Sequence, residues 1–368
     1  MRPKVAITNW IHPDLLEEVR EFADAAANQS REALTARAAA EAAADADAVI
    51  AFMPDRVDAA FLDACPRLKI VAGALKGCDN FDAEACAARG VWLTVVPDLL
   101  SAPTAELLAT LFLGLTRNVR RGDELVRSGK FAGWRPVLYG ASAGGKRFGF
   151  LGMGAVGREA AKRLGAFGMK LVYSDLKRMA PDEEKSLGLE FCSPDELVNS
   201  CDFVAPLLPL NASTLHFIDA ARLSKFKRGA YLINVGRGST VDEEAVADAL
   251  ESGILAGYAA DVFEMEDWAR EDRPRGVAPR LLNPELNTLF TPHLGSATDE
   301  ARRAITKAAI AEVRRVLSGR PPLNAVNSPR FGCRRAADSP EPQFRKSPAE
   351  SEGGVRKNAL TPRARAIP

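Results

Sequence analysis

The feature that most constrains this chain is a glycine-rich turn near its middle, residues 151–157 (LGMGAVG). The turn follows the apolar run 148–150 and opens an amphipathic segment, a pattern that predicts a strand, a tight turn and a helix. Gly152 permits the turn, Gly154 lets a phosphate approach the backbone, and Gly157 lets the helix pack closely on the strand. Because a helix N-terminus offers free N–H groups to phosphate, the segment predicts a dinucleotide site.

A second predicted strand favours a dinucleotide site over a plain glycine turn. The run 170–174 ends in Asp175, about 20 residues past the first glycines, where a carboxylate binds the hydroxyls of an adenosine ribose. Such a carboxylate would repel the 2′-phosphate of NADP, and Leu176 offers no compensating charge. We therefore expect NAD as the cofactor, with a preference that Lys177 and Arg178 could soften.

Alternating apolar runs and helical segments predict an α/β protein of two Rossmann-like domains. Four runs predict a small, flavodoxin-like substrate domain over residues 1–100: 4–8, 48–53, 68–75 and 91–96. Six runs predict a doubly wound NAD-binding domain over residues 101–296: 148–150, 170–174, 202–208, 230–235, 255–263 and 287–291. Residues 297–330 would return to the substrate domain, so the NAD-binding domain is inserted in it and the active site lies in the cleft between them.

Two further segments have other roles. Residues 104–127 predict one long helix, apolar first and basic later, that links the domains and forms part of a subunit contact. An ordinary core helix explains this periodicity equally well. From residue 331 onward Ser, Pro, Arg, Lys and Glu dominate, so we expect a disordered tail over 331–368.

The composition argues against several classes of partner. The net charge is +1, the six cysteines lack disulfide or metal-site spacing, and no apolar run is long enough to span a bilayer. We therefore expect a cytoplasmic protein with no nucleic-acid partner, no membrane partner and no metal.

Three polar residues follow three successive predicted strands. Arg237, in the segment NVGRG, has a guanidinium suited to holding an oxyanion in two contacts. Glu266 lies past the next strand, and His293 follows the last one in TPHLGSA. Ligands of such sheets bind beyond the carboxyl ends of the strands, and a carboxylate beside an imidazole favours its protonated form. The three residues predict an acid–base centre beside an anion-binding group.

Together these motifs resemble the D-isomer-specific 2-hydroxyacid dehydrogenases. The resemblance runs from about residue 4 to 327 and rests on four segments: 152–157, 234–238, 261–266 and 291–297. It implies the split two-domain fold, a homodimer and NAD as cofactor. It also implies that the catalytic residues are Arg237, Glu266 and His293.

Three other segments resemble one group of that family, the phosphite (phosphonate) dehydrogenases, which oxidise phosphite to phosphate with NAD and water: 51–58, 74–82 and 261–274. Lys76 lies in a loop where many relatives lack a lysine. A small dianion without a carbon tail requires concentrated positive charge, which such a lysine would supply. We therefore expect phosphite as the substrate, with direct hydride transfer from phosphorus to nicotinamide. Gly236 and residues 296–300 are closer to the wider family.

The resemblance also implies the remaining site residues. The substrate would contact Met53, Lys76, Gly77, Trp134, Tyr139, Arg237, His293 and Arg302. The cofactor would contact Lys76, Thr104, Gly152, Gly154, Ala155, Val156, Gly157, Asp175, Leu176, Leu208, Pro209, Val235, Gly236, Arg237, Asp261, His293 and Gly295.

Two other functions remain open from the sequence. A reductase of glyoxylate, hydroxypyruvate or another 2-oxo acid would use the same three catalytic residues, with His293 protonating the carbonyl oxygen and Lys76 contributing less. A nucleotide-sensing corepressor shares this fold, but a pure sensor has no chemical need for the full catalytic set.

Overall fold

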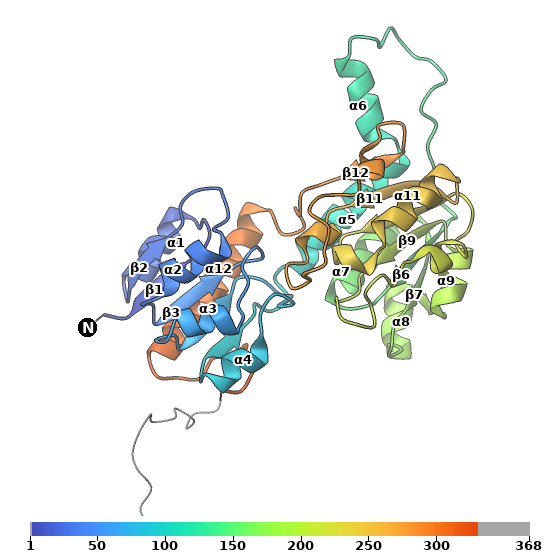
Figure 1. Ribbon diagram of the computed structural model, residues 1–368. Coiled ribbons are helices and arrows are strands. Elements are labelled where there is room, and N and C mark those ends of the chain that lie inside the picture. The colour runs from blue at the N-terminus through green and yellow to red at the C-terminus, as the bar shows by residue number, and fades with distance from the viewer. Residues whose placement is uncertain (1, 330–368) are drawn as a thin grey trace, which may run out of the picture. The chain divides into compact units, whose positions relative to one another are not determined.

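The structure is a computed structural model that describes residues 2–329 (Figure 1). The tail predicted over 331–368 lies outside the described residues. Two parallel sheets organise the described chain, as the α/β prediction required. None of the described helices is both long and apolar enough to cross a membrane.

The first sheet has five strands in the order β2-β1-β3-β4-β5, the flavodoxin-like order. Its strands are β1 Lys4–Ile7, β2 Asp24–Ala27, β3 Ala48–Ala51, β4 Ile70–Gly73 and β5 Trp92–Thr94. The sequence reading missed β2, because this short edge strand is a run of alanines after an aspartate, with alternating exposure and no β-branched residue. We call this sheet and its helices the small lobe.

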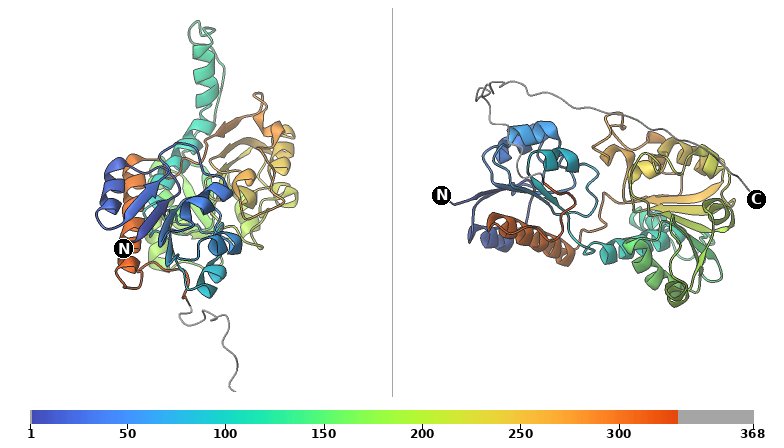
Figure 2. Two further views of the ribbon diagram at one scale, coloured as in Figure 1. Left: turned by 60° about the vertical axis from the view of Figure 1, so that its left-hand side comes forward. Right: turned by 90° about the horizontal axis from the view of Figure 1, so that it is seen from below.

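Helices cover both faces of the small sheet (Figure 2). One face packs on α1 (Pro13–Arg20) and α12 (Asp299–Leu317), whose buried Leu15, Ile310 and Val313 share a core with strand residues. The other face packs on α2 Ala36–Ala43, α3 Ala59–Ala64 and α4 Ala83–Ala88. Helix α12 comes after every strand of the second sheet and yet packs on the first sheet. The chain therefore returns to its first lobe, as Figure 1 shows by the orange helix among blue ones.

The second sheet has seven parallel strands in the order β12-β11-β10-β9-β6-β7-β8. They are β6 Arg147–Leu151, β7 Lys170–Ser174, β8 Leu189–Phe191, β9 Phe203–Pro206, β10 Ala230–Asn234, β11 Leu255–Ala260 and β12 Thr288–Phe290. The order is that of a doubly wound dinucleotide fold, extended by one strand. The sequence reading of six strands missed β8, a three-residue edge strand. We call this sheet and its helices the large lobe.

The helices of the large lobe connect these strands on both sides of the sheet. They are α7 Ala155–Leu164, α8 Pro181–Leu187, α9 Pro194–Ser200, α10 Ala220–Leu223 and α11 Glu243–Glu251. The short α9 begins with a reciprocal capping box, in which the Ser193 hydroxyl accepts from the Glu196 amide and the Glu196 carboxylate accepts from the Ser193 amide.

The prediction of one helix over 104–127 is wrong, because the segment forms two helices, α5 Ser101–Thr116 and α6 Val119–Arg127. Asn118 separates them with a left-handed φ of 53°, and its side-chain amide donates to the carbonyls of Leu138 and Tyr139. This single backbone conformation is invisible to periodicity, and asparagine is among the few residues that adopt it readily.

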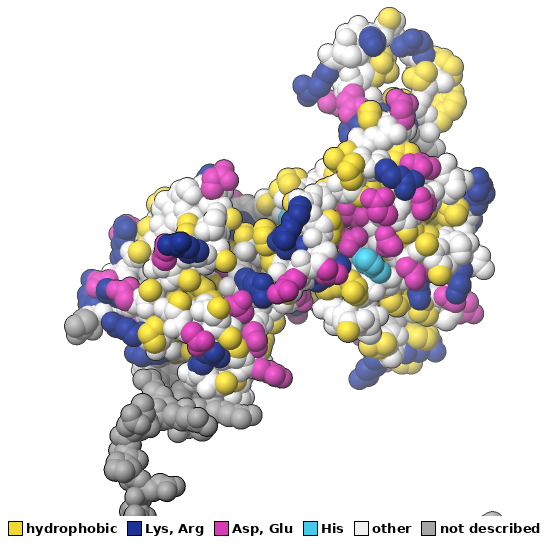
Figure 3. All heavy atoms as spheres, viewed as in Figure 1, with side chains coloured by type: hydrophobic (Ala, Val, Ile, Leu, Met, Phe, Trp, Pro, Cys, Tyr) yellow, Lys and Arg dark blue, Asp and Glu magenta, His cyan; other side chains and the backbone are white. Residues whose placement is uncertain are grey.

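Helix α6 and the loop 128–146 form what we call the arm, which extends away from the large lobe (Figure 1). In contrast to α5, helix α6 buries no residue. Charges of both signs are interspersed on the face in Figure 3, and apolar side chains are visible on the arm. The large apolar residues that the arm exposes are Val119, Val126, Phe131, Trp134, Val137 and Tyr139.

Candidate active site

Three adjacent strands of the large sheet bring the catalytic candidates together. Strands β10, β11 and β12 are hydrogen-bonded neighbours, and Arg237, Glu266 and His293 follow them in turn. Nδ1 of His293 and Oε2 of Glu266 are 2.6 Å apart, and both side chains are about a quarter to a third exposed. A carboxylate on Nδ1 orients the imidazole and leaves Nε2 for a reacting molecule.

The turn that carries His293 is held by a buried carboxylate. His293 has a left-handed φ of 57°, which costs a non-glycine residue about 1–2 kcal/mol. Asp261, which is 1 % exposed, accepts the amides of Leu294 and Gly295 at 2.6 and 2.8 Å and the hydroxyl of Thr291 at 2.6 Å. Burial raises the pKa of the Asp261 carboxyl, and these donors oppose that rise. Asp261 therefore fixes the unusual backbone that directs the imidazole.

The loop that carries Arg237 is fixed by hydrogen bonds from both sides. The side-chain amide of Asn234 and the hydroxyl of Thr240 donate to the Arg237 carbonyl at 3.0 and 2.7 Å. Any side chain at Gly238 would collide with the backbone of Phe263, three residues before Glu266. The loops of Arg237 and Glu266 are consequently packed backbone against backbone.

An ionic cluster beneath these loops joins them further. Nη1 of Arg270 donates to the Ser239 hydroxyl at 2.7 Å and to Glu264 at 3.1 Å. Nε2 of His216 lies 2.7 Å from the same Glu264 carboxylate, and the Ser239 amide donates to Asp267 at 2.8 Å. These contacts hold the segment after β10 against the segment after β11.

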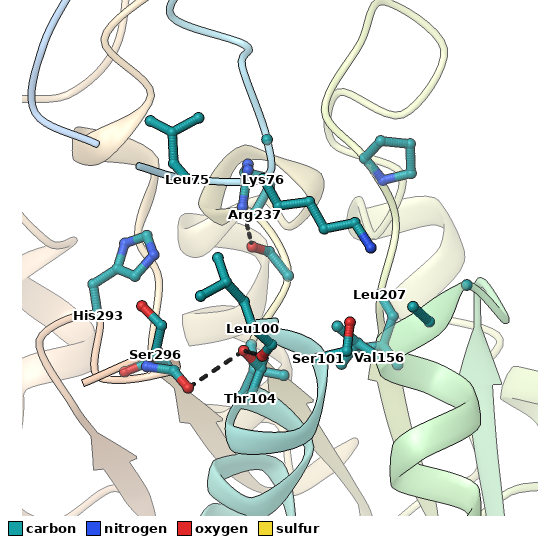
Figure 4. A pocket seen from close by; sticks show the side chains of 18 of the residues that line it. Leu75, Lys76, Leu100, Ser101, Thr104, Val156, Leu207, Arg237, His293 and Ser296 are labelled. Atoms are coloured by element: carbon teal, nitrogen blue, oxygen red, sulfur yellow. Dashed lines mark hydrogen bonds between the residues drawn. The ribbon is translucent and has the colours of Figure 1, made fainter. Parts of the chain in front are cut away.

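A pocket of about 300 Å³ lies beside the catalytic candidates and is lined by both lobes. Figure 4 shows His293 on one side of it and Val156 and Leu207 on the other, with Lys76 and Arg237 above Leu100 and Ser101. Its lining includes most of the expected residues: Met53, Lys76, Gly77, Thr104, Gly154, Ala155, Val156, Gly157, Leu208, Pro209, Val235, Gly236, Arg237, Asp261, His293, Gly295 and Arg302.

The glycine turn fits a dinucleotide in its geometry. Gly152 has φ 95°, and a Cβ at residue 157 would lie 2.9 Å from the Met153 sulfur. A Cβ at residue 154 would meet nothing within 4 Å, and no side chain caps α7 at this residue. The first turn of α7 therefore presents uncapped N–H groups to open space, which suits a pyrophosphate.

The adenosine end of the site is farther from this pocket. Gly152, Asp175 and Leu176 do not line the pocket, and Asp175 accepts the Met153 amide at 2.7 Å at the end of β7. Leu176 is fully exposed. An acidic group at this strand end beside the glycine turn is the arrangement that binds ribose hydroxyls.

Two expected lining residues lie elsewhere in this chain. Trp134 and Tyr139 are 84 % and 79 % exposed on the arm, and neither lines the pocket. The resemblance alone implied that Trp134 and Tyr139 contact the substrate. In the structure, the break at Asn118 directs this segment away from the sheet.

Lys76 lines the pocket but already has an acidic partner. Its ammonium pairs with Asp98, and its side chain is 42 % exposed. Burial lowers the pKa of Lys76. The concentrated positive charge expected there is therefore partly neutralised within the chain itself.

Several lining residues were absent from the sequence reading: Ala74, Leu75, Asp79, Leu100, Ser101, Leu207 and Ser296. Asp79 lies in the same short segment as Lys76, and no local pattern in that segment indicates a role for its carboxylate. Its partner is Arg237, 158 residues away in sequence.

The comparisons with known proteins agree with this geometry. Residues 109–295 match the model of the D-isomer specific 2-hydroxyacid dehydrogenase, NAD binding domain. The glyoxylate reductase of Thermococcus onnurineus is 35 % identical over 332 residues, which are 89 % of this chain and 96 % of that protein. The chain belongs to the D-isomer specific 2-hydroxyacid dehydrogenase family. The family assignment confirms the two Rossmann-like domains and NAD as the type of cofactor.

Solved structures of similar proteins have the same fold. A Thermus thermophilus protein superposes with a TM-score of 0.78 at 33 % identity, covering 88 % of this chain and 99 % of that one. An NADPH-dependent glyoxylate/hydroxypyruvate reductase of Sinorhizobium meliloti, solved with NADP and malonate, gives 0.75 at 29 % identity, covering 89 % and 98 %.

These relatives overturn the expectation of phosphite oxidation. Similar proteins at 33–35 % identity are named glyoxylate reductases, and similar solved structures include a glyoxylate reductase and a glyoxylate/hydroxypyruvate reductase.

The Asp261 contacts predict the effect of Asp261→Asn. The asparagine retains one acceptor oxygen, but its NH₂ group faces the Gly295 amide, so that two donors oppose each other and one hydrogen bond is lost. We therefore expect the free energy of unfolding to fall by about 1–3 kcal/mol. Thermal unfolding followed by circular dichroism measures this loss. Asp182→Asn, on the exposed first turn of α8, is the matched control. Equal melting temperatures of the two variants would show that Asp261 does not support the turn.

Proposed function

We propose that this dehydrogenase reduces a small 2-oxo acid of the glyoxylate or hydroxypyruvate type to the corresponding 2-hydroxy acid with NADH. The observation that carries the proposal is the convergence of an arginine, an imidazole and its carboxylate partner on three adjacent strand ends beside the glycine turn. A 2-oxo acid needs those groups, since it has a carboxylate to bind and a carbonyl oxygen to protonate. The names of the relatives support the same class of substrate.

Arg237 is the group that would bind the substrate carboxylate. Its guanidinium lines the pocket and can hold two carboxylate oxygens at once. Arg302 on α12 lines the same pocket from the small lobe, stacked over the Phe52 ring at 5.7 Å. Burial lowers the pKa of Arg302, and no carboxylate among residues 2–329 offsets this effect. It would add a second positive charge at the substrate.

His293 would act as the general acid. Its Nδ1 is held by Glu266, so Nε2 is the nitrogen that can donate a proton to the carbonyl oxygen. When bound, NADH supplies the hydride for the carbonyl carbon. The glycine turn, α7 and Asp175 would hold the dinucleotide so that its nicotinamide end reaches the pocket.

Turnover of purified protein tests the proposal. We expect NADH to be consumed with glyoxylate or hydroxypyruvate, and kcat/KM to be lower with NADPH because Asp175 repels a 2′-phosphate. Absorbance at the NADH band, followed over a series of 2-oxo acids with NADH and with NADPH, gives kcat/KM for each substrate and each cofactor. No consumption of NADH or NADPH with any 2-oxo acid would refute the proposed reaction.

The role of Glu266 gives a second test. In Glu266→Gln the imidazole loses its anionic partner, so we expect kcat to fall on the order of 100-fold. Steady-state kinetics of glyoxylate reduction measures this fall. Glu285→Gln, an exposed change before β12, should keep the parent kcat. A Glu266→Gln enzyme with the parent kcat would remove Glu266 from this role.

The arm supports a proposal of a homodimer. It exposes six large apolar side chains that no other part of residues 2–329 buries, and exposed apolar surface of this kind is characteristic of an interface. A second copy would cover them and would also give Trp134 and Tyr139 a buried environment.

Sedimentation of the full chain tests this pairing. We expect twice the mass of the 39.5 kDa chain, and we expect Trp134→Glu to shift the equilibrium toward monomer because it places a charge in an apolar contact. Leu323→Glu, at a 74 % exposed site on the small lobe, should leave the dimer intact. A monomeric parent would contradict the proposal.

A further inference from the structure

The guanidinium of Arg237 is held by a loop of the opposite lobe. Nε of Arg237 donates to Oδ2 of Asp79 at 2.6 Å, and Asp79 lies between β4 and α4 of the small lobe. Gly77 of the same loop lies so close to the guanidinium that any Cβ there would collide with Nη2. The loop therefore contacts the guanidinium at two places, through Asp79 at Nε and through Gly77 at Nη2.

The contact is that of a partly buried pair. The side chains of Arg237 and Asp79 are 21 % and 27 % exposed. Paired groups at that depth are less screened by solvent than groups at an open surface. The bond is also charge-assisted, and such bonds constrain orientation as well as distance.

Asp79 leaves the substrate-binding edge of the arginine available. A guanidinium has five N–H donors. The Nε hydrogen goes to Asp79, and one Nη1 hydrogen goes to the Gly236 carbonyl at 3.1 Å. The remaining donors are on the two Nη atoms, which together form the end-on fork for a carboxylate.

The residue after Asp79 ties the same loop to the other catalytic segment. The side-chain amide of Asn80 donates to the Met53 carbonyl at 3.0 Å, and its oxygen accepts the Ala269 amide at 3.2 Å. Ala269 follows Glu266 by three residues. Two consecutive small-lobe residues thus contact the segments that carry Arg237 and Glu266.

We propose that Asp79 is a positioning residue that fixes the Arg237 guanidinium with its Nη edge toward the substrate carboxylate. The inference rests on the proposed function, in which Arg237 binds the 2-oxo acid. Because donor and acceptor belong to different lobes, the arginine is fully oriented only when the loop of Asp79 lies against the large lobe. Substrate affinity therefore depends on a contact that no residue near Arg237 in sequence provides.

Asp79→Asn is the direct test, with steady-state kinetics of glyoxylate reduction as the readout. The amide cannot anchor the guanidinium as an ion does, so we expect KM for the 2-oxo acid to rise about 10-fold while KM for NADH is unchanged. In an Arg237→Lys background the same change should add little, because the two residues act through one contact. Asp82→Asn makes the same change of charge and is the control. The Asp82 side chain accepts the Ala85 amide at the start of α4, and an asparagine oxygen can accept it too, so this variant should behave as the parent.

Two results would overturn the proposal. An unchanged KM in the Asp79→Asn enzyme would show that Asp79 does not position the arginine. A lower KM would show that Asp79 competes with the substrate for the guanidinium.

A binding measurement separates this inference from the proposed function. Calorimetric titration of oxalate, in the presence of NAD⁺, reports the anion affinity of parent and variant without turnover. We expect about 10-fold weaker binding to the variant. An inactive parent would refute the 2-oxo acid reaction alone, whereas equal oxalate affinities would refute the role of Asp79 alone.

Discussion

The parallel pairing of β10, β11 and β12 is the constraint on which the site depends. Since parallel strands end at the same edge of a sheet, residues far apart in sequence emerge side by side there. The pairing supplies proximity but not orientation. Orientation comes from the hydrogen bond between His293 and Glu266, from the carboxylate of Asp261 under the histidine turn, and from the backbone packing at Gly238.

Three basic side chains of the pocket have acidic partners, whereas Arg302 has none among residues 2–329. Lys76 has Asp98, Arg237 has Asp79 and His293 has Glu266. A pocket that holds a small anion gains from positive charge, but unpaired cations in a partly buried site repel one another and lose solvation. The acidic partners reduce that cost.

The sequence predicted this fold and site where local pattern determines them. The glycine turn, the strand ends and the three residues after them follow from periodicity and from the rule that ligands bind at carboxyl ends. The edge strands β2 and β8 and the break at Asn118 depend on tertiary pairing or on one dihedral angle, so pattern did not show them. The bond between Arg237 and Asp79 joins residues 158 positions apart, and only the folded chain reveals it.

Arg237 and His293 are proposed to act on one 2-oxo acid at the end of the large sheet. A crystal structure with NADH and oxamate, an unreactive 2-oxo acid analogue, would test this arrangement. We expect the oxamate carboxylate on the Nη atoms of Arg237 and its carbonyl oxygen on Nε2 of His293. Oxamate bound away from either residue, with NADH in place, would contradict it.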